Sequence, residues 1–420
     1  MVKRVDTVVV GGGPAGLAAA IAFYDAGGTD VVVVERDQHL GGILQQCIHN
    51  GFGLQWFKEE LTGPEYAQRF IDEVEKRKIP CETGTMVLDM REREDGTKSV
   101  YCLSPRYGVL EYQCRHIILA MGCRERVRGN IKIPGTRPAG IYSAGLAQRL
   151  VNLEGMMPGH EIVILGSGDI GLIMARRMHW EGAHVKMVCE LMPYSSGLPR
   201  NITQCLEDNH IPLRLSTTVV EIHGKDRLEG VTIAAVDENK KPIDATREYV
   251  PCDTLLLSVG LIPENELSKT LCIAMDPVTG GPVVSEYRET SVSGVFACGN
   301  VLHVHDIVDF VSTESTIAGR AAARGGKPLA SVPIQAAYPV RYTVPQRCSL
   351  SEPFTIYWRS AYPLENGTVV LKINGQTVLK QKFLRVVPAQ MQELFITEKH
   401  LETLRGYELS DAQISLEVEL

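Results

Sequence analysis

One pattern occurs twice in this chain, and the second copy follows the first at an offset of 155 residues, from 11 to 166. The first copy consists of Gly11, Gly13, Gly16 and Glu35, and the second of Gly166, Gly168, Gly171 and Glu190. Each copy follows an apolar run typical of a buried parallel strand, at residues 5–10 and 161–165. A helix is expected next, at 17–26 and 172–181, and then a strand that leads to the glutamate, at 30–34 and 184–189. This context predicts two Rossmann-type dinucleotide-binding domains.

Each position of the pattern has its own physical purpose. Gly11 and Gly166 allow the tight turn from strand to helix, and the next glycine leaves room for a diphosphate beside the backbone. The last glycine lets the helix pack closely against the sheet. The helix N-terminus offers N–H groups and a positive dipole to the phosphates. The two glutamates are placed to accept hydrogen bonds from a ribose diol.

The two copies differ in ways that bear on the cofactor. Pro14 stands at the first helical position, where its missing N–H costs little, whereas Asp169 brings a negative charge toward the diphosphate. We therefore expect the first site to retain its cofactor, FAD, and the second to exchange its cofactor, NAD(H). Glu190 favours NADH over NADPH, because a carboxylate repels a 2′-phosphate and residues 191–194 supply no arginine to bind one.

These motifs resemble the pyridine nucleotide–disulfide oxidoreductase superfamily, which includes thioredoxin reductase. Residues 117–122, 255–260 and 294–300 resemble three further segments of that superfamily, and the resemblance extends from residue 1 to about 328. The resemblance implies an FAD-dependent oxidoreductase that uses NAD(P)H. The cofactor-binding residues that it implies, with those of the repeat, are Gly11, Gly13, Pro14, Ala15, Gly16, Glu35, Arg36, Gly42, Ala120, Gly122, Gly166, Gly168, Asp169, Ile170, Gly171, Glu190, Gly260, Gly299 and Asn300.

The late motif departs from the family at one position. The family ends this motif in Gly-Asp and uses the aspartate to bind the ribityl chain of FAD, whereas Asn300 stands here. An amide still hydrogen-bonds a hydroxyl, so FAD binding is expected with altered charge near the flavin. The helix that follows, at 307–323, points its N-terminus at the flavin in the family. Asp306 and Asp309 near its start are interpreted as ordinary helix caps rather than proton carriers.

The redox cysteine pair of the disulfide reductases is missing. After Gly41-Gly42 there is one cysteine, Cys47, and residues 142–159 before the second motif contain none. Cys47 is the candidate catalytic residue, acting alone, against the alternative of a structural thiol whose only neighbour able to lower its pKa is His49. His303 and His305 are not taken as metal ligands, because we expect their side chains to face opposite ways on an extended segment that lacks further ligands.

Residues 41–53 and 298–312 resemble a narrower group, the flavoproteins encoded beside anaerobic FAD-dependent glycerol-3-phosphate dehydrogenases. That group is related to flavoprotein subunits of sarcosine oxidase, opine dehydrogenase and hydrogen cyanide synthase. The resemblance implies a partner dehydrogenase subunit that oxidises the substrate, and a small cysteine-rich electron carrier as a further partner.

The composition argues against several other classes of protein. The net charge of -7 and the pI of about 5.9 offer no basic surface for nucleic acid. The 11 cysteines include no Cys-x-x-Cys pair, which argues against a disulfide framework, a zinc site or an iron–sulfur cluster. The start of the chain shows no signal peptide, and no apolar run is long enough to cross a membrane, so a cytoplasmic protein is expected. Homo-oligomerisation stays open.

The C-terminal region changes from a helical period to a period of two. Residues 327–345 are interpreted as a linker, and strands are expected at 355–359, 368–373, 376–386 and 414–420. Asn374-Gly375 predicts a type I′ hairpin turn. We expect a small antiparallel β-sandwich that serves either docking or support of the FAD domain.

The predicted fold is therefore α/β, with two three-layer Rossmann-like domains, the NAD domain inserted in the FAD domain. The expected limits are 1–137 and 254–330 for the FAD domain, 138–253 for the NAD domain and 331–420 for the β domain. The leading hypothesis for function is hydride transfer between NAD(H) and FAD with electrons exchanged with a partner dehydrogenase. A stand-alone NADH oxidase or reductase that uses Cys47, and a non-catalytic nucleotide-binding subunit, are the alternatives.

Overall fold

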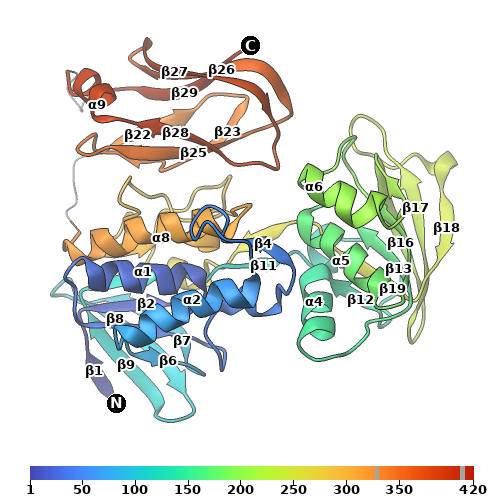
Figure 1. Cartoon of the computed structure of the whole chain (residues 1–420), viewed down its shortest axis with the longest axis horizontal. Helices are drawn as coiled ribbons and strands as arrows, with labels where there is room; N and C mark the ends of the chain where they lie inside the picture. The colour runs from blue at the N-terminus through green and yellow to red at the C-terminus, as the bar shows by residue number, and fades with distance from the viewer. Residues whose placement is uncertain (327–330, 407–411) are drawn as a thin grey trace. The chain divides into compact units, whose positions relative to one another are not determined.

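The computed structural model describes residues 1–326, 331–406 and 412–420. It contains two compact units, one made of residues 1–123 and 263–420 and the other of residues 124–262 (Figure 1). The second unit is an insertion in the sequence of the first, as predicted. The chain passes between them within β11 (Cys123–Glu125) and β20 (Leu261–Pro263). Residues 124–137 and 254–262 thus belong to the inserted unit, although the sequence placed them in the FAD domain.

The first unit contains a three-layer Rossmann-like domain. Its parallel sheet has the order β21-β10-β2-β3-β6. The strands are β2 (Thr7–Val10), β3 (Val31–Val34), β6 (Cys81–Glu82), β10 (His116–Leu119) and β21 (Val295–Ala297). Every residue of β2, β3 and β10 is buried, because both faces of the sheet are covered.

Helices cover one face of this sheet and a second sheet covers the other. The helices are α1 (Pro14–Asp25), α2 (Gly63–Lys76) and α8 (Val308–Ala323). A Cβ on Gly319 of α8 would lie 2.2 Å from the Ala19 carbonyl oxygen of α1, so a small residue is what lets these helices approach closely. The second sheet has the order β1-β9-β8-β7, with β1 (Val2–Arg4), β7 (Met86–Glu92), β8 (Lys98–Ser104) and β9 (Gly108–Cys114).

The inserted unit repeats this plan. Its parallel sheet has the order β12-β19-β13-β14-β15, with β12 (Ile141–Ser143), β13 (Glu161–Leu165), β14 (His184–Cys189), β15 (Leu213–Arg214) and β19 (Thr254–Leu257). One face carries α4 (Ala144–Asn152), α5 (Asp169–Trp180) and α6 (Pro199–Ile202). The other carries β16 (Thr217–Gly224), β17 (Leu228–Ala235) and β18 (Glu248–Pro251).

The two glycine-motif helices begin at Pro14 and at Asp169, so Pro14 occupies the first helical position as expected, and both helices start three residues before the ranges 17–26 and 172–181. The glycine before each, Gly13 or Gly168, has extended backbone angles and forms the N-cap. Shorter elements complete the two units: η1 (Gly42–Gln46), β4 (Asn50–Phe52), β5 (Leu61–Thr62), α3 (Arg128–Ile131), η2 (Thr203–Glu207), η3 (Asp244–Thr246), α7 (Glu266–Thr270) and η4 (Gly299–Val301). Among the described residues, no helix is both long and apolar enough to span a membrane.

The C-terminal region is a two-sheet β domain, as predicted. Its sheets, β24-β22-β29-β26-β27 and β23-β25-β28, enclose an apolar core that includes Trp358 and Leu416. The elements are β22 (Val332–Ala336), β23 (Val340–Val344), β24 (Arg347–Cys348), β25 (Phe354–Ser360), β26 (Leu364–Ile373), β27 (Gln376–Val386), β28 (Gln392–Ile396), α9 (Glu398–Leu404) and β29 (Ile414–Glu419).

Three details of this domain test the sequence interpretation. Asn374 and Gly375 both have positive φ, 48° and 78°, as the predicted type I′ turn requires. The prediction of a linker at 327–345 is wrong beyond residue 331, because β22 and β23 lie there and Val332 and Val340 are buried. Residues 327–330 lie outside the described part of the chain. The sheet is also not purely antiparallel, because β22 pairs with β29 in parallel.

Candidate functional site

The first glycine turn leaves a cradle that fits a diphosphate. Gly11 has a φ of +109°, and a Cβ there would lie 2.4 Å from the Ala120 carbonyl oxygen. A Cβ on Gly16 would lie 1.8 Å from the Gly11 carbonyl oxygen, which explains the third glycine. Around Gly13, by contrast, the nearest atom to an added Cβ is Gly42 Cα at 3.9 Å. The protein leaves this space open beside the first N–H groups of α1.

The turn of the inserted unit has the same geometry. Gly166 has a φ of +100°, and a Cβ there would lie 2.0 Å from the Ser258 carbonyl oxygen. A Cβ on Gly171 would meet the Gly166 carbonyl oxygen at 2.6 Å, and Ser258 Oγ accepts from the Gly171 N–H at 3.0 Å. At Gly168 an added Cβ would have only ordinary contacts, the nearest at 3.5 Å. Both turns therefore fit a dinucleotide.

The two predicted ribose-binding glutamates are buried against their own turns. Glu35 accepts from the N–H groups of Gly12 at 2.6 Å and Asp37 at 2.7 Å, one on each oxygen. Glu190 is engaged more heavily, since its Oε2 accepts from the Ser167 N–H and hydroxyl and from the Ser196 hydroxyl. Its Oε1 accepts from the Met192 N–H at 2.9 Å. Glu190 therefore has fewer unused acceptor positions left for a ribose than Glu35 has.

The repeat extends further than the sequence interpretation recognised. Gly42 and Gly197 keep the offset of 155, and each lies against its own glycine turn. A Cβ on Gly42 would lie 3.0 Å from Gly13 Cα, and one on Gly197 would lie 2.8 Å from the Ser167 carbonyl oxygen. Continuing the alignment of the two copies past the glutamates would have found Gly197.

Asp169 is held by its own unit. Its Oδ1 accepts from the Leu198 N–H at 2.8 Å and from Asn201 Nδ2 at 2.6 Å. The carboxylate thus fixes the segment that leads into α6 while it stands at the first position of α5. Its negative charge at the diphosphate end of the helix is therefore partly offset by these two donors.

The late motif meets the first turn inside the first unit. A Cβ on Gly299, whose φ is +73°, would lie 2.8 Å from Ala15 Cβ, so η4 and α1 are in direct contact. Asn300 points its Nδ2 toward Cys123 Sγ at 3.5 Å. The other predicted positions are Gly122 and Gly260, both with positive φ, the half-buried Ile170 at the start of α5, and Arg36, whose exposed guanidinium lies 3.4 Å from Glu264.

Asp306 and Asp309 do not cap α8, which corrects the sequence interpretation. The N-cap is Ile307, and it makes no side-chain capping bond. Asp309 instead accepts from the N–H groups of Gly53 at 3.3 Å and Trp56 at 2.8 Å. The buried carboxylate thereby ties the segment after Gly41-Gly42 to the start of α8.

Asp306 joins the loop after the late motif to the C-terminal domain. It pairs with the Arg359 guanidinium of β25 and accepts from the Met391 N–H at 2.5 Å. Arg359 also donates to the Val304 carbonyl oxygen at 3.0 Å. The β domain therefore supports the loop that follows the late motif, which favours the supporting role that the sequence left open.

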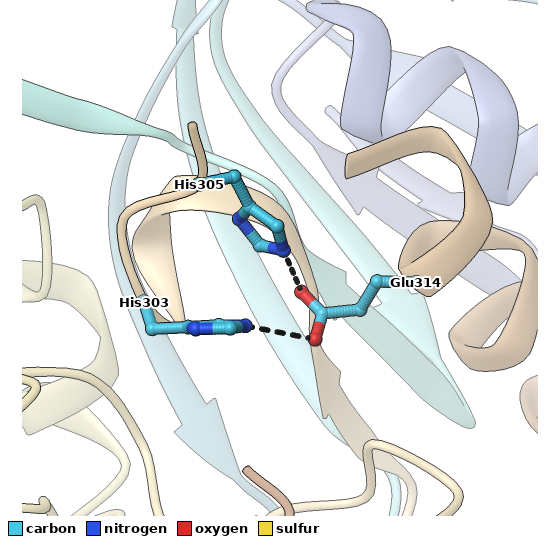
Figure 2. A group of neighbouring side chains, drawn as sticks. All are labelled: His303, His305 and Glu314. Carbon is cyan, nitrogen blue, oxygen red and sulfur yellow. Dashed lines mark hydrogen bonds and ion pairs between the residues drawn. The ribbon is translucent and has the colours of Figure 1, made fainter. Parts of the chain in front are cut away.

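His303 and His305 face the same way, contrary to the sequence interpretation. Figure 2 shows both rings directed at the Glu314 carboxylate of α8. His303 Nε2 lies 3.1 Å from Oε1, His305 Nε2 lies 3.3 Å from Oε2, and the ring centroids are 4.2 Å apart. The segment follows the helical turn η4 and is not a strand, so the alternation of an extended chain does not apply.

Arg288 completes this buried cluster. Its Nε donates to Glu314 Oε1 at 3.0 Å, and the Gly299 N–H donates to Oε2 at 3.0 Å. Arg288 and Glu314 are fully buried. The neighbouring His303, His305 and Arg288 hold the pKa of Glu314 well below its usual range even though burial alone would raise that pKa. The carboxylate is therefore ionised and holds the late FAD motif in place.

His303 is expected to make the fold sensitive to mild acid. Burial lowers the pKa of His303 to about 4, against about 6.5 for an unfolded chain. The folded protein then binds fewer protons than the unfolded chain, so this part of the stability is complete above about pH 6.5 and is lost as the pH falls toward 4. Urea unfolding should show a loss of roughly 3 kcal/mol over that window.

His303→Gln serves as the matched variant for this experiment. It should be less stable near neutral pH but should show a shallower fall in the free energy of unfolding between about pH 6.5 and pH 5. Parallel curves for the two proteins would show that His303 does not carry the acid sensitivity.

Cys47 lies in an environment that disfavours a reactive thiolate. Its Sγ lies 3.3 Å from the Ile43 carbonyl oxygen, and burial raises the pKa of the Cys47 thiol to about 12. Burial likewise raises the pKa of the Cys298 thiol to about 12. All eleven cysteines lie in the described part of the chain, and none of them forms a disulfide. The catalytic role predicted for Cys47 stays a prediction, and it lacks the lowered pKa that such chemistry uses.

Two glycine turns of one geometry, each at the end of a strand in a parallel sheet, are typical of a protein with two dinucleotide-binding sites. The sequence profile of "Pyridine nucleotide-disulphide oxidoreductase" matches residues 5–324, and the chain belongs to this family. The family uses FAD and NAD(P)H, and these are the cofactors of this flavoprotein.

Curated relatives are distant. Hydrogen cyanide synthase subunit HcnB of Pseudomonas protegens is 26% identical over 287 residues, 63% of this chain and 58% of that protein. The NAD(P)H coenzyme A polysulfide/persulfide reductase of Pyrococcus horikoshii is 26% identical over 73% of this chain and 64% of that protein. An opine oxidase subunit of Agrobacterium tumefaciens is 20% identical over 70% of this chain and 61% of its own. The chain thus matches about three fifths of the length of these relatives.

Solved structures show the same fold. Thioredoxin reductase of T. acidophilum matches 76% of this chain and 98% of its own with a TM-score of 0.62 and 21% identity. Thioredoxin reductase of Lactococcus lactis matches the same shares with a TM-score of 0.63 and 18% identity. The fold is therefore that of thioredoxin reductase, with the β domain added at the C-terminus.

Proposed function

We propose that this chain holds FAD at the Gly11–Gly16 turn and NAD(H) at the Gly166–Gly171 turn, transfers hydride between them, and exchanges electrons with a partner dehydrogenase subunit. The observation that carries the proposal is the pair of open glycine cradles, which have one geometry in the two units. When bound, FAD supplies the redox chemistry and accepts or returns a hydride. The chain's own residues bind, orient and shield the two cofactors, which is what hydride transfer needs.

A partner protein is supported by two observations. Two of the relatives, HcnB of hydrogen cyanide synthase and the opine oxidase protein, are named as subunits of larger enzymes. The thiol at the position where disulfide reductases begin their redox pair, Cys47, has a raised pKa. Electrons that do not leave through a disulfide need another acceptor or donor. We propose a glycerol-3-phosphate dehydrogenase-like partner, with a small cysteine-rich carrier, on the resemblance of residues 41–53 and 298–312.

A stand-alone reductase that uses Cys47 is the second candidate. The name of one relative, an NAD(P)H coenzyme A polysulfide/persulfide reductase, favours this class. Anaerobic mixing of the purified flavoprotein with NADH separates the alternatives, because bleaching of the flavin is expected for both enzymes and not for a nucleotide-binding subunit. Loss of all acceptor activity in Cys47→Ser, with bleaching intact, would favour the stand-alone reductase over the partner system.

The nicotinamide site is expected to prefer NADH to NADPH. Glu190 is ionisable, lies beside the turn, and would repel a 2′-phosphate. We expect kcat/KM for flavin reduction by NADH to exceed that for NADPH by about tenfold or more, which corresponds to about 1.4 kcal/mol. Glu190→Gln should bring the ratio of kcat/KM for NADH to kcat/KM for NADPH closer to one. Equal kcat/KM values for the two nucleotides in the wild type would contradict the assignment.

A further inference from the structure

His305 differs from His303 in what surrounds its ring. Its Nδ1 lies 3.3 Å from Asn300 Oδ1, and its Nε2 lies 3.3 Å from Glu314 Oε2. The orientation of the Asn300 amide is fixed independently, because Oδ1 accepts from the His305 backbone N–H at 3.0 Å. Each ring nitrogen therefore lies 3.3 Å from an oxygen, although only Nδ1 forms a hydrogen bond in this arrangement. A neutral imidazole has one N–H, so only a ring with a second proton can donate to both.

His303 has no such arrangement. Its Nε2 donates to Glu314 Oε1. His303 Nδ1 and His305 Nε2 are both buried without a hydrogen-bond partner within the described residues, but of the two only His305 Nε2 lies within ion-pair distance of a carboxylate, at 3.3 Å from Glu314 Oε2. One proton satisfies this ring, in agreement with its lowered pKa. Of the two histidines in the cluster, His305 is thus the one built to bind a further proton.

We interpret the cluster as a hydrogen-bonded network rather than a cation site, although the candidate ligand atoms of His303, His305 and Glu314 all lie within 4.8 Å of one another. Although two imidazoles and a carboxylate gather here, the carboxylate already accepts three hydrogen bonds, from Arg288 Nε, His303 Nε2 and the Gly299 N–H, and His305 Nε2 lies 3.3 Å from Oε2 without a hydrogen bond. The fully buried Arg288 guanidinium already places a positive charge beside the carboxylate, so any cation added here, a metal ion or a protonated His305, shares one carboxylate with Arg288.

His305 contacts Asn300, which stands where the family has the residue that binds the ribityl chain of FAD. Asn300 is bound directly by the His305 ring and backbone, and α8 begins just beyond, at Val308. The other groups that face His305 are Glu314 of α8, His303 at 4.2 Å between ring centroids, and the Tyr357 ring of β25 at 6.5 Å. Asp306, the next residue along the chain, is paired with Arg359 of the β domain.

We propose that His305 couples reduction of the bound flavin to the uptake of one proton by the protein. This inference rests on the proposed binding of FAD beside Asn300. A hydride leaves C4 of the dihydronicotinamide with both electrons of its C–H bond and forms one new bond to the flavin. The nicotinamide is oxidised, and the reduced flavin gains one negative charge. His305 binds one proton from water, and the resulting imidazolium offsets that charge while it donates to both Asn300 and Glu314.

Proton uptake during reduction tests this directly. Hydride transfer from NADH to FAD alone consumes no proton, so at about pH 8 in weak buffer the flavin step leaves the pH unchanged unless the protein titrates. With an indicator dye and anaerobic NADH, the wild-type holoprotein is expected to take up one proton per flavin reduced. His305→Gln, which keeps a side chain able to hydrogen-bond, is expected to take up none. His303→Gln is the matched control and is expected to behave as the wild type.

Equilibrium titration of the flavin with redox mediators gives a second readout that does not need NADH. If one proton is bound with two electrons, the reduction equilibrium changes tenfold per pH unit and the flavin reduction potential falls by about 30 mV per pH unit. If two protons are bound, the equilibrium changes a hundredfold and the potential falls by about 59 mV per pH unit. The wild type should follow the steeper slope and His305→Gln the shallower one.

Equal proton uptake and equal slopes in the wild type and His305→Gln would overturn the inference while leaving the proposed function intact. A stoichiometric metal ion in the purified protein that is lost in His303→Gln would also overturn it. A holoprotein whose flavin titrates with mediators but is not reduced by NADH would contradict only the proposed nicotinamide reaction. A protein that retains no flavin would overturn both.

Discussion

Replacing Gly16 with alanine is expected to yield a protein that purifies without FAD and unfolds more readily. The new Cβ would lie 1.8 Å from the Gly11 carbonyl oxygen and 3.2 Å from Val9 Cγ1. Neither neighbour can move without displacing the turn, since Gly11 itself lies against the Ala120 carbonyl oxygen. We expect a cost of about 3 kcal/mol, at the upper end for overpacking a core. Flavin absorbance of the purified protein and urea unfolding measure the two effects.

The repeat supplies the comparison for this experiment. Gly171→Ala makes the equivalent contact in the inserted unit, with the Gly166 carbonyl oxygen at 2.6 Å, and should weaken NADH binding while FAD is retained. Gly129→Ala is the control, because an added Cβ there meets nothing within 4 Å. If Gly16→Ala kept its flavin and lost NADH binding, the assignment of FAD to the first turn would be reversed.

The paired glycine turns could be predicted from the sequence because their geometry is local. A strand, a turn with φ above zero and a helix start are all specified by neighbouring residues. Pro14 marks the first helical position in the sequence because its missing N–H costs little there, whereas Asp169 is compatible with either a loop or the first helical position. The extension of the repeat to Gly197 is equally local, since Gly42 and Gly197 keep the offset of 155.

The cluster around Glu314 could not be predicted in the same way. His303 and His305 were interpreted with the alternation of an extended strand, but η4 turns the chain and both rings point inward. Arg288 and Glu314 are far apart in the sequence, and nothing local indicates that they pair. Asp309 similarly has the sequence position of a helix cap, but its carboxylate accepts hydrogen bonds from the N–H groups of Gly53 and Trp56 instead. The contacts of these residues are made with partners distant in the sequence, and the spacing of residues along the chain does not predict such partners.

Replacing Arg288 with methionine should destabilise the protein by about 3–5 kcal/mol, because it leaves the Glu314 carboxylate buried without its counter-charge. The guanidinium is fully buried and donates to Glu314 at 3.0 Å, so the loss is not screened by water. Arg324→Met removes the exposed pair with Glu352 and is the matched control, with an expected cost below about 1 kcal/mol. Urea unfolding of both variants at neutral pH gives the comparison.

The double variant Arg288→Met/Glu314→Gln determines whether the charge or the packing is responsible. If the unpaired carboxylate causes the loss, removing its charge should recover a large part of the roughly 3–5 kcal/mol, even though only one of the His303 and Gly299 donors can then meet the amide oxygen and the other faces the amide NH2 group. If the loss comes from the space left by the Arg288 side chain, the double variant should be no more stable than Arg288→Met. Because the Gly299 N–H is held by Glu314, flavin retention should follow the same order as stability.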